Sequence, residues 1–171
     1  MDVRRKSDRI MSIKLGESSE IFNVVSVYAP QIGLEDIKRL FCENLDVVIQ
    51  SIPQNEEIFV GGDFNGNIGI KGDGYEMVHG GFRYGERNNG GMSILNFAVA
   101  YELSIVNFYF KKKEEHLVTF KSDNTRTQID YFLVRVNTRI LYKDCKMIPS
   151  ECLVTQHRSL VMDVVIRSSI R

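Results

Sequence analysis

The stretch IFVGGDFNGN, residues 58–67, decides how the rest of the chain is interpreted. Ile58, Phe59 and Val60 are consecutive apolar residues, which predict a short buried strand. Two glycines follow, and then Asp63 and Asn65, so polar side chains begin where the strand ends. In layered α/β proteins, ligand sites gather at the carboxyl ends of strands. We therefore expect a functional site here, because a carboxylate and an amide suit the orientation of a water and of a phosphate oxygen. The alternative is an Asx turn after the strand.

A calcium loop is a competing interpretation of the same residues. Asp63, Asn65 and Asn67 match the first three ligand positions of an EF-hand. The sixth position holds Ile68, where glycine is needed, and the twelfth holds Gly74, where a bidentate glutamate is needed. The spacing therefore excludes an EF-hand.

Upstream of this stretch, the sequence predicts a hairpin followed by a helix. Residues 9–15 alternate and residues 21–28 are rich in β-branched side chains, with a turn at 16–20 between them. Residues 34–52 change to a spacing of three and four, which indicates an amphipathic helix that ends before Pro53. A strand, a helix and a strand of these lengths favour mixed α/β layering.

Downstream, glycine is unevenly distributed, since 11 of the 13 glycines lie between residues 61 and 91. So long a loop inside a compact domain favours a functional role. Residues 92–103 have helical spacing, and 111–116 form a charged turn. Short strands are expected at residues 104–110, 117–120, 129–134, 145–148 and 160–166.

Composition limits the class of protein. The chain has 171 residues, a length that suits one domain over residues 1–171. Its 22 basic and 22 acidic side chains cancel, so we expect no bulk electrostatic attraction to nucleic acid or membrane. Three cysteines cannot all pair within the chain, so a disulfide scaffold is not expected. We therefore expect a nuclear or cytoplasmic location, where thiols stay reduced. No apolar run is long enough to span a bilayer, and the start lacks the apolar region of a signal peptide. We expect Arg4 and Arg5 to lie on a solvated strand edge.

Three residues far from Asp63 are further candidates for the site. Asp130 interrupts the apolar strand at residues 129–134, so its carboxylate must be solvated, hydrogen-bonded or paired. His157 precedes the last strand, and an aspartate commonly orients a histidine. Tyr28 ends the strand VVSVYAP and can present its hydroxyl at the same edge. The alternatives are a surface histidine beside a loop and a tyrosine in simple edge packing.

The order of these motifs resembles the endonuclease/exonuclease/phosphatase superfamily. VVSVYAP (24–30), IFVGGDFNGN (58–67), TQIDYFLV (127–134) and TQHRSLVMDV (155–164) occur in the order that this family shows. HGGFRYGERNNGG (79–91) and KKKEEHLVTFKS (111–122) are similar to the endonuclease domains of plant LINE-type retroelements and to craniofacial development protein 2-like proteins. The resemblance covers essentially the whole chain and implies a two-sheet α/β sandwich with outer helices.

The resemblance also implies roles for individual residues. Family members hydrolyse phosphodiester or phosphomonoester bonds by in-line attack of water, assisted by Mg²⁺ or Mn²⁺. Asp63 would orient and deprotonate the water, and Asn65 and Tyr28 would hold the phosphate. His157 would bind a non-bridging oxygen, and Asp130 would orient His157. The implied partner is DNA, contacted by surface lysines, and a reverse transcriptase domain is implied in an ancestral polyprotein.

Two departures from the family pattern lower the activity that we expect. The family begins with strands that carry an asparagine and then a metal-binding glutamate, whereas the chain begins at MDVRRKSDRI, and neither Glu17 nor Glu20 follows a buried strand. We therefore expect a sandwich that lacks its first strands. Gln156 stands where the family usually has an aspartate, and an amide brings no negative charge for a cation. The leading hypothesis is a metal-dependent endonuclease of weak or absent activity, and the alternatives are a non-catalytic interaction module and a phosphatase of the same superfamily.

Overall fold

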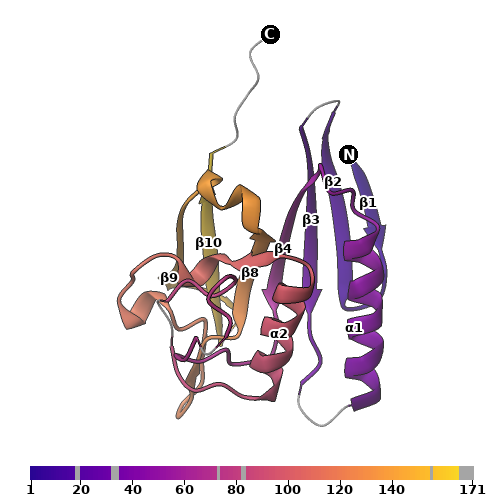
Figure 1. The fold of residues 1–171 in the computed structure, drawn as a ribbon. Coiled ribbons are helices and arrows are strands. Elements are labelled where there is room, and N and C mark those ends of the chain that lie inside the picture. Colours follow the sequence, from indigo (N-terminus) through magenta and orange to yellow (C-terminus); the bar gives the residue numbers. More distant parts are fainter. Residues whose placement is uncertain (18–19, 32–34, 73, 82–83, 155, 166–171) are drawn as a thin grey trace.

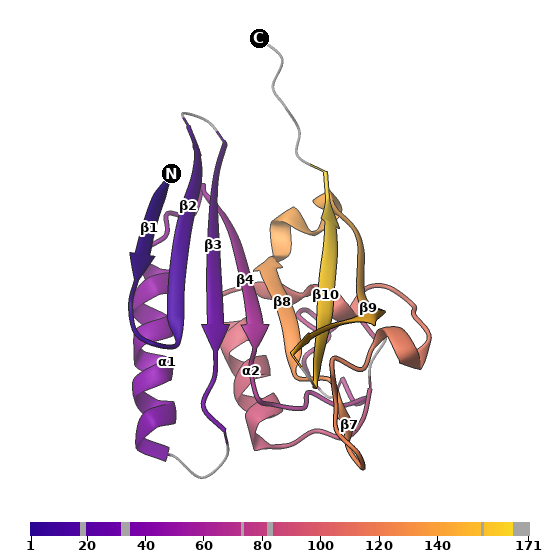
Figure 2. The same cartoon turned by 180° about the vertical axis from the view of Figure 1, so that it is seen from behind.

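Two β-sheets pack face to face, and two helices cover the outer face of the larger sheet (Figure 1). The computed structural model describes residues 1–17, 20–31, 35–72, 74–81, 84–154 and 156–165. Seen from behind, the smaller sheet lies on the other face of the larger one (Figure 2). This arrangement confirms the α/β sandwich expected from the sequence.

The larger sheet has six strands in the order β1-β2-β3-β4-β8-β5. Their bounds are β1 Asp2–Arg5, β2 Ile10–Glu17, β3 Glu20–Tyr28, β4 Glu57–Asp63, β8 Asp130–Arg135 and β5 Leu103–Ile105. The predicted hairpin is β2 and β3, and residues 18–19 of its turn lie outside the described part. β3 and β4 run parallel, whereas the other neighbours are antiparallel.

The helix α1, Glu35–Gln50, makes the crossover between the parallel strands, and α2, Asn89–Ala100, follows the glycine-rich loop. Residue 34 of the predicted first helix lies outside the described residues. The helices and the sheet share one core, in which Phe41 and Leu45 of α1 and Leu95 of α2 pack with Val25 and Val60. Each such buried side chain stabilises the fold by roughly 1.5–3 kcal/mol.

The smaller sheet has the order β7-β6-β10-β9. Its strands are β6 Phe120–Lys121, β7 Arg126–Thr127, β9 Tyr142–Val154 and β10 His157–Val164. The predicted strands at 145–148 and 160–166 lie within or over β9 and β10, and residue 166 is outside the described part. Three 3₁₀ helices connect the strands: η1 Val106–Phe108, η2 Glu114–His116 and η3 Val136–Leu141.

Two predicted strands are wrong in extent. The strand expected at 104–110 stops at Ile105 and becomes η1, because the Asn107 side chain takes the place of a neighbouring strand. Its Nδ2 donates to the Asp130 carbonyl at 3.1 Å, and its Oδ1 accepts from the Phe132 amide at 2.9 Å. The strand expected at 117–120 is limited to β6, because the amides of Leu117 and the next residue donate to Glu114 and close η2.

The structure also bears on the expectations for the first strand, the cysteines and membrane spans. Arg4 and Arg5 belong to β1, whose residues are all exposed, so the solvated strand edge is confirmed. Cys42 and Cys145 carry free thiols. No helix within the described ranges is long and apolar enough to cross a membrane.

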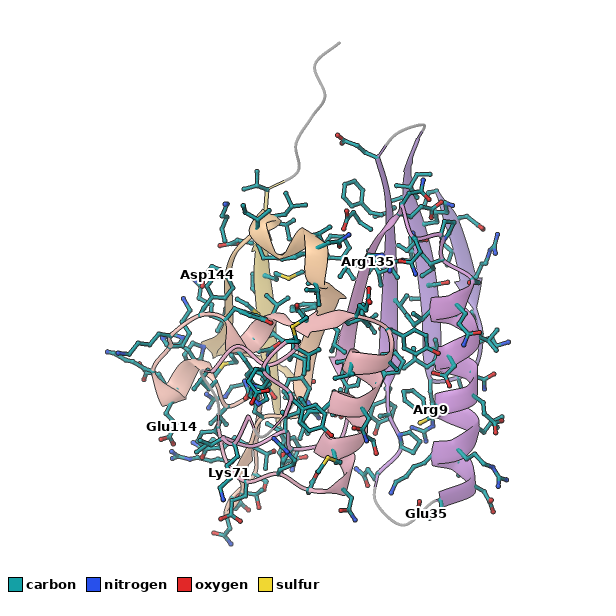
Figure 3. The ribbon with its side chains drawn as sticks, in the orientation of Figure 1. Arg9, Glu35, Lys71, Glu114, Arg135 and Asp144 are labelled. Atoms are coloured by element: carbon teal, nitrogen blue, oxygen red, sulfur yellow. The ribbon has the colours of Figure 1, made fainter. Side chains whose placement is uncertain are left out.

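A buried arginine fixes the turn that enters β4 (Figure 3). Arg135 Nε donates to the Glu56 carbonyl at 3.0 Å, and Nη2 donates to the Pro53 carbonyl at 3.1 Å. Glu56 in turn accepts from Lys14 Nζ at 2.6 Å and from Asn23 Nδ2 at 2.8 Å. These bonds hold β4 in register between β3 and β8.

Candidate active site

Three neighbouring strands present the predicted side chains in one row. Tyr28 of β3 lies opposite Asp63 of β4, and Asp63 lies opposite Asp130 of β8. Residues directly opposite one another across a sheet project from the same face. The register therefore places these side chains on the face that the smaller sheet covers in part.

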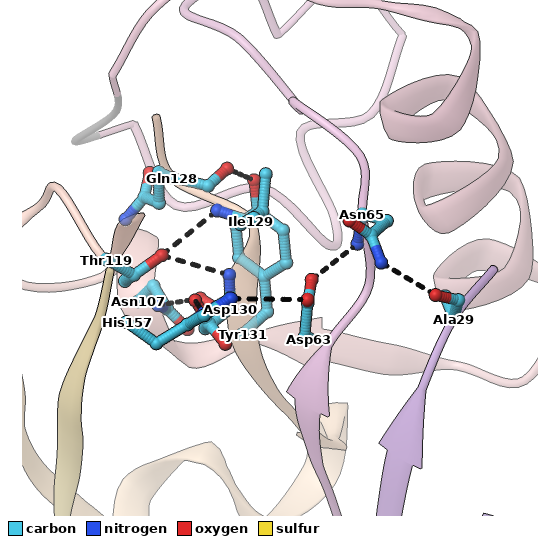
Figure 4. A network of polar contacts seen from close by, with 10 residues as sticks. All are labelled: Ala29, Asp63, Asn65, Asn107, Thr119, Gln128, Ile129, Asp130, Tyr131 and His157. Carbon is cyan, nitrogen blue, oxygen red and sulfur yellow. Dashed lines mark hydrogen bonds and ion pairs between the residues drawn. The ribbon is translucent and has the colours of Figure 1, made fainter. Parts of the chain in front are cut away.

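His157 approaches this row from the smaller sheet, at the first residue of β10 (Figure 4). Its Nδ1 lies 3.2 Å from Asp130 Oδ2, and its Nε2 lies 3.7 Å from Asp63 Oδ2. The ring of Phe120 packs edge-on against the imidazole at a centroid distance of 5.0 Å. The imidazole is thus held between two carboxylates, and the nearer one fixes its orientation.

Asn65 is joined to the same cluster through the turn after β4. Its amide nitrogen donates to Asp63 Oδ1 at 2.8 Å, which is the Asx turn considered from the sequence. Its side-chain Nδ2 donates to the Ala29 carbonyl at 2.7 Å, and its φ of 48° is left-handed. An asparagine tolerates this conformation better than most residues. The Asx turn is confirmed, and it brings Asn65 into the candidate site.

Burial raises the pKa of both carboxyl groups, Asp63 and Asp130. The pKa of Asp63 is raised to about 6, chiefly because burial penalises the charged carboxylate, and the charge of Asp130 adds to the rise. The Asn65 amide and His157 act in the opposite direction. Burial also raises the pKa of Asp130, against hydrogen bonds from Thr119 and His157. A carboxyl group that titrates near neutrality is a better proton acceptor than an ordinary aspartate.

Among the candidate residues, Tyr28 is the most exposed. Its side chain is 48% exposed, and the Arg9 guanidinium lies over its ring at 5.1 Å. The register brings it beside Asp63, as expected.

Sequence reasoning missed the residues that hold Asp130 in place. Thr119, fully buried, accepts at Oγ1 from the amides of Ile129 and Asp130, both at 3.1 Å. Tyr131 is also buried, and its hydroxyl donates to the Gly66 carbonyl at 3.0 Å, which ties β8 to the loop after Asp63. A hydroxyl within the apolar stretch LVTF was the available signal for Thr119.

The comparison with solved structures finds chains of the same fold. The endonuclease domain of TRAS1, a telomere-specific non-LTR retrotransposon, superimposes with a TM-score of 0.63 at 16% identity, over 91% of this chain and 61% of that one. An endonuclease/exonuclease/phosphatase family protein from Leptotrichia buccalis has a TM-score of 0.58 at 14% identity, over 92% and 53%. A 3′-5′ exonuclease from Neisseria meningitidis has a TM-score of 0.66 at 13% identity, over 91% and 64%.

The chain has the endonuclease/exonuclease/phosphatase fold. Among curated proteins it is similar to craniofacial development protein 2 of Bos taurus, at 28% identity over 160 residues, and of Tragulus javanicus, at 27%. A Transposon TX1 protein of Xenopus laevis is 35% identical over 57 residues, 33% of this chain and 4% of that protein. The chain spans about a quarter of the length of the first two relatives, 26% and 27%. No family model matches it.

The described residues of this endonuclease/exonuclease/phosphatase fold do not form a metal site of their own. No group of three or more His, Cys, Asp or Glu side chains is placed to hold an ion within those residues. Three of the four carboxyl oxygens of Asp63 and Asp130 are already engaged, since both Oδ2 atoms face His157 and Asp63 Oδ1 accepts from Asn65. Magnesium prefers several free oxygen ligands.

Proposed function

We propose that this chain is a phosphodiesterase domain of the endonuclease type, which hydrolyses nucleic acid. One observation carries the proposal: Asp63, Asp130 and His157 come from three separate strands and meet within 3.7 Å at one edge of the fold. Buried titratable groups with shifted pKa values are typical of catalytic sites. The fold shared with a retrotransposon endonuclease domain and a 3′-5′ exonuclease supports the same reaction class.

In the proposed attack of water on phosphorus, Asp63, His157 and Asp130 have different roles. Asp63 accepts a proton from the water as the water oxygen bonds to phosphorus, and its raised pKa suits this role near neutral pH. As the imidazolium, His157 donates Nδ1–H to Asp130, which orients the ring, and Nε2–H to a non-bridging oxygen of the phosphate. The bond from phosphorus to the leaving oxygen breaks, and solvent protonates that oxygen.

Asn65 and Tyr28 complete the phosphate contacts. An amide nitrogen has two hydrogens. One hydrogen of Asn65 Nδ2 is used by the Ala29 carbonyl, which leaves the other for a phosphate oxygen. Tyr28 is exposed beside Asp63 and offers its hydroxyl to a second oxygen.

A basic hollow supports nucleic acid as the substrate. It has a volume of about 610 Å³ and lies on the smaller sheet next to His157. Four cations and two carboxylates, Glu114 and Glu115, line it, so cations are in excess. None of the four cations forms an ion pair within the described ranges: Lys113, Lys121, Arg126 and Arg158. Such cations suit the phosphate backbone. The match to a transposon protein also supports a polyprotein context. A reverse transcriptase in that polyprotein is part of the proposal because the family resemblance implies it.

Dependence on Mg²⁺ or Mn²⁺ is part of the proposal because the family resemblance implies it. The residues described would need further oxygen ligands, such as those of the substrate phosphate. The matching test is a titration of plasmid nicking with each cation and with EDTA. Nicking that persists unchanged in EDTA would remove the metal from the proposal and leave the rest intact.

The main experiment is nicking of supercoiled plasmid by the wild type, Asp63→Asn and His157→Gln. Both variants should lose roughly 10²–10⁴-fold in rate, as expected for removal of an acid–base group. Asp163→Asn, an exposed aspartate on β10, is the matched control and should cleave normally. Equal nicking by all four proteins would show contamination and contradict the proposal.

A non-catalytic interaction module is the second candidate. The observation that favours it is the incomplete metal site, whose oxygens are engaged by neighbouring groups. The same experiment decides between the two, since this candidate predicts no nicking in any variant. Phosphate release from soluble phosphomonoesters without nicking would instead identify a phosphatase.

A further inference from the structure

A pocket of about 630 Å³ opens between α1 and α2, on the face of the larger sheet that these helices cover (Figure 1). Pockets of roughly 300–1,000 Å³ are typical of small-molecule sites. Residues of both helices line it, together with residues that directly follow β3 and β4. The pocket therefore lies at the end of the sheet that carries the candidate active site.

The interior of the pocket is apolar and rich in aromatic rings. Phe41 of α1 is 8% exposed, and Phe64 after β4 and Ile94 of α2 are each 6% exposed. Phe97 of α2 also lines the pocket and is only partly buried. An aromatic side chain can stack on any nucleobase, because every base has a π-face. The interior therefore suits a planar aromatic group.

Each charged side chain among the lining residues is already paired. Lys38 Nζ lies 2.9 Å from Glu35 Oε1, and Arg39 Nη2 lies 3.1 Å from Asp36 Oδ1. A charged occupant would have to displace one of these partners. The pairing therefore favours an uncharged group inside the pocket.

Polar groups at the start of α2 have unused hydrogen-bonding capacity at the pocket. Asn88 caps this helix, and its Oδ1 accepts from the amides of Gly91 at 2.9 Å and Asn67 at 3.0 Å. Its Nδ2 carries two hydrogens that form no bond within the described residues. Ser93 Oγ donates to the Asn89 carbonyl at 3.1 Å and keeps its lone pairs as acceptors. A donor and an acceptor suit the hydrogen-bonding edge of a nucleobase.

Asn65 joins the pocket to the candidate active site. It lines the pocket, and its amide nitrogen donates to Asp63 Oδ1. Its Nδ2 donates to the carbonyl of Ala29, which is also a lining residue. A phosphate held by Asn65 would thus lie at the border of the pocket. The base of the same nucleotide is the planar, uncharged group nearest to it.

A contact between the two helices closes the far end of the pocket. The Tyr101 hydroxyl, just after α2, accepts from Gln50 Nε2 at 3.1 Å and donates to Asp46 Oδ1 at 2.9 Å. Both partners come after Leu45, the last residue of α1 that lines the pocket. The entry is therefore at the end near Asn65.

We propose that this pocket holds the base of an unpaired nucleotide whose phosphate is bound at Asn65. The inference rests on the proposed function and specifies its substrate, a single-stranded or locally unpaired nucleic acid. A base within a duplex would first have to leave its stack and its pair, at a cost in free energy.

The test measures binding by fluorescence anisotropy in the Asp63→Asn background, with two labelled strands of equal length, about eight nucleotides, and equal charge. One is oligodeoxyadenylate, and the other carries tetrahydrofuran residues without bases. The adenylate strand should bind at least about fivefold more tightly, as expected for one base stacked on an aromatic ring. Phe97→Leu should bring this ratio close to one. Phe22→Leu is the matched control, a partly buried ring at the opposite end of β3 from Tyr28, and should keep the ratio.

Cys42 allows a second measurement without a substitution in the pocket. Its thiol is free, and the residue is exposed and lines the pocket. Alkylation with N-ethylmaleimide should also bring the ratio close to one, because the added group occupies the pocket. Cys42→Ser should keep the ratio with and without the reagent.

Circular dichroism melts establish that Phe97→Leu is folded, and the alkylated protein replaces this variant if it is not. Equal binding of the two strands by the parent protein would overturn the proposal, as would a ratio that neither Phe97→Leu nor alkylation changes. Loss of the ratio in reagent-treated Cys42→Ser would also contradict it, since the reagent would then act elsewhere. Absence of plasmid nicking with a ratio that depends on Phe97 would contradict the proposed function alone and leave the pocket as a base-binding site.

Discussion

At the scale of single residues, the position proposed as catalytic, Asp63, carries a cost in stability. Its folded pKa of about 6 lies above its ordinary value of 3.8 because the carboxylate is buried. Because the pKa is raised on folding, the protonated carboxyl of Asp63 stabilises the folded state. This stabilisation is fully present below pH 3.8 and is lost as the pH rises through about 6. The charged form of Asp63 therefore weakens the fold at neutral pH, where the proposed reaction needs it.

Asp63→Asn tests this directly. At pH 8 the variant should melt roughly 2–6 °C above the wild type, because it removes a buried charge, and near pH 4 the difference should disappear. Differential scanning calorimetry at the two values checks it. A variant that melts below the wild type at pH 8 would show that the hydrogen bond from Asn65 outweighs the burial of the charge.

Asp130 acts on its neighbours rather than on substrate, so its variant has a distinct signature. Asp130→Asn should lower the cleavage rate roughly 10²-fold or more, because His157 loses the carboxylate that orients it. The charge of Asp130 also raises the pKa of Asp63. The acidic limb of the pH–rate profile should therefore move to lower pH. A fall in rate with an unmoved limb would indicate a merely structural role.

The sequence was sufficient to single out these candidate residues because each interrupts an apolar strand or ends one. Asp63 and Asn65 end β4, and Asp130 begins β8 beside buried Tyr131. Their meeting with His157 was expected only from a family resemblance. Thr119 escaped prediction because a buried threonine in a strand has no distinctive pattern until its hydrogen-bond partners, ten and eleven residues away, are known.

At the scale of elements, the glycine-rich loop depends on close contact with the first turn of α2. Asn88 caps this helix, and its Oδ1 accepts from the amides of Gly91 and Asn67. A Cβ on Gly91 would lie 1.8 Å from the Asn67 carbonyl oxygen. The loop that leaves Asp63 is therefore positioned by a glycine more than twenty residues further along the chain.

Gly91→Ala should destabilise the protein by roughly 1–3 kcal/mol, since the clash outweighs the better helix propensity of alanine. Gly90→Ala is a matched control one residue earlier, where the nearest atom would be 3.0 Å away. Its cost should be clearly smaller. Urea unfolding compares the two, and equal stabilities would show that the loop moves freely away from α2.

Element types were easier to predict than their ends. The hairpin and both helices follow from periodicity, which local sequence carries. The strand at 104–110 was overestimated because Asn107 replaces backbone pairing with side-chain bonds to β8. That exchange depends on a strand more than twenty residues away, so no local pattern reports it.

At the scale of the whole molecule, a net charge of zero conceals an uneven distribution. Acidic side chains balance the total, yet four cations without ion pairs among the described residues surround the hollow beside β10: Lys113, Lys121, Arg126 and Arg158. The long-range field is therefore weak, and nucleic-acid binding should depend on this local patch. The zero net charge of the chain is therefore compatible with a local cluster of cations that binds phosphate.

Binding of duplex DNA should fall with salt, with a log–log slope no steeper than about −4, since each neutralised phosphate contributes about −0.9. Arg126→Gln should make this slope shallower by about 1 and weaken binding similarly for different sequences. Fluorescence anisotropy in the Asp63→Asn background measures binding without cleavage. Lys6→Gln, in the exposed turn after β1, is the control and should leave the slope unchanged. A slope unaffected by Arg126→Gln would place the nucleic acid elsewhere on the surface, because a cation that contacts phosphate must release a counterion when DNA binds.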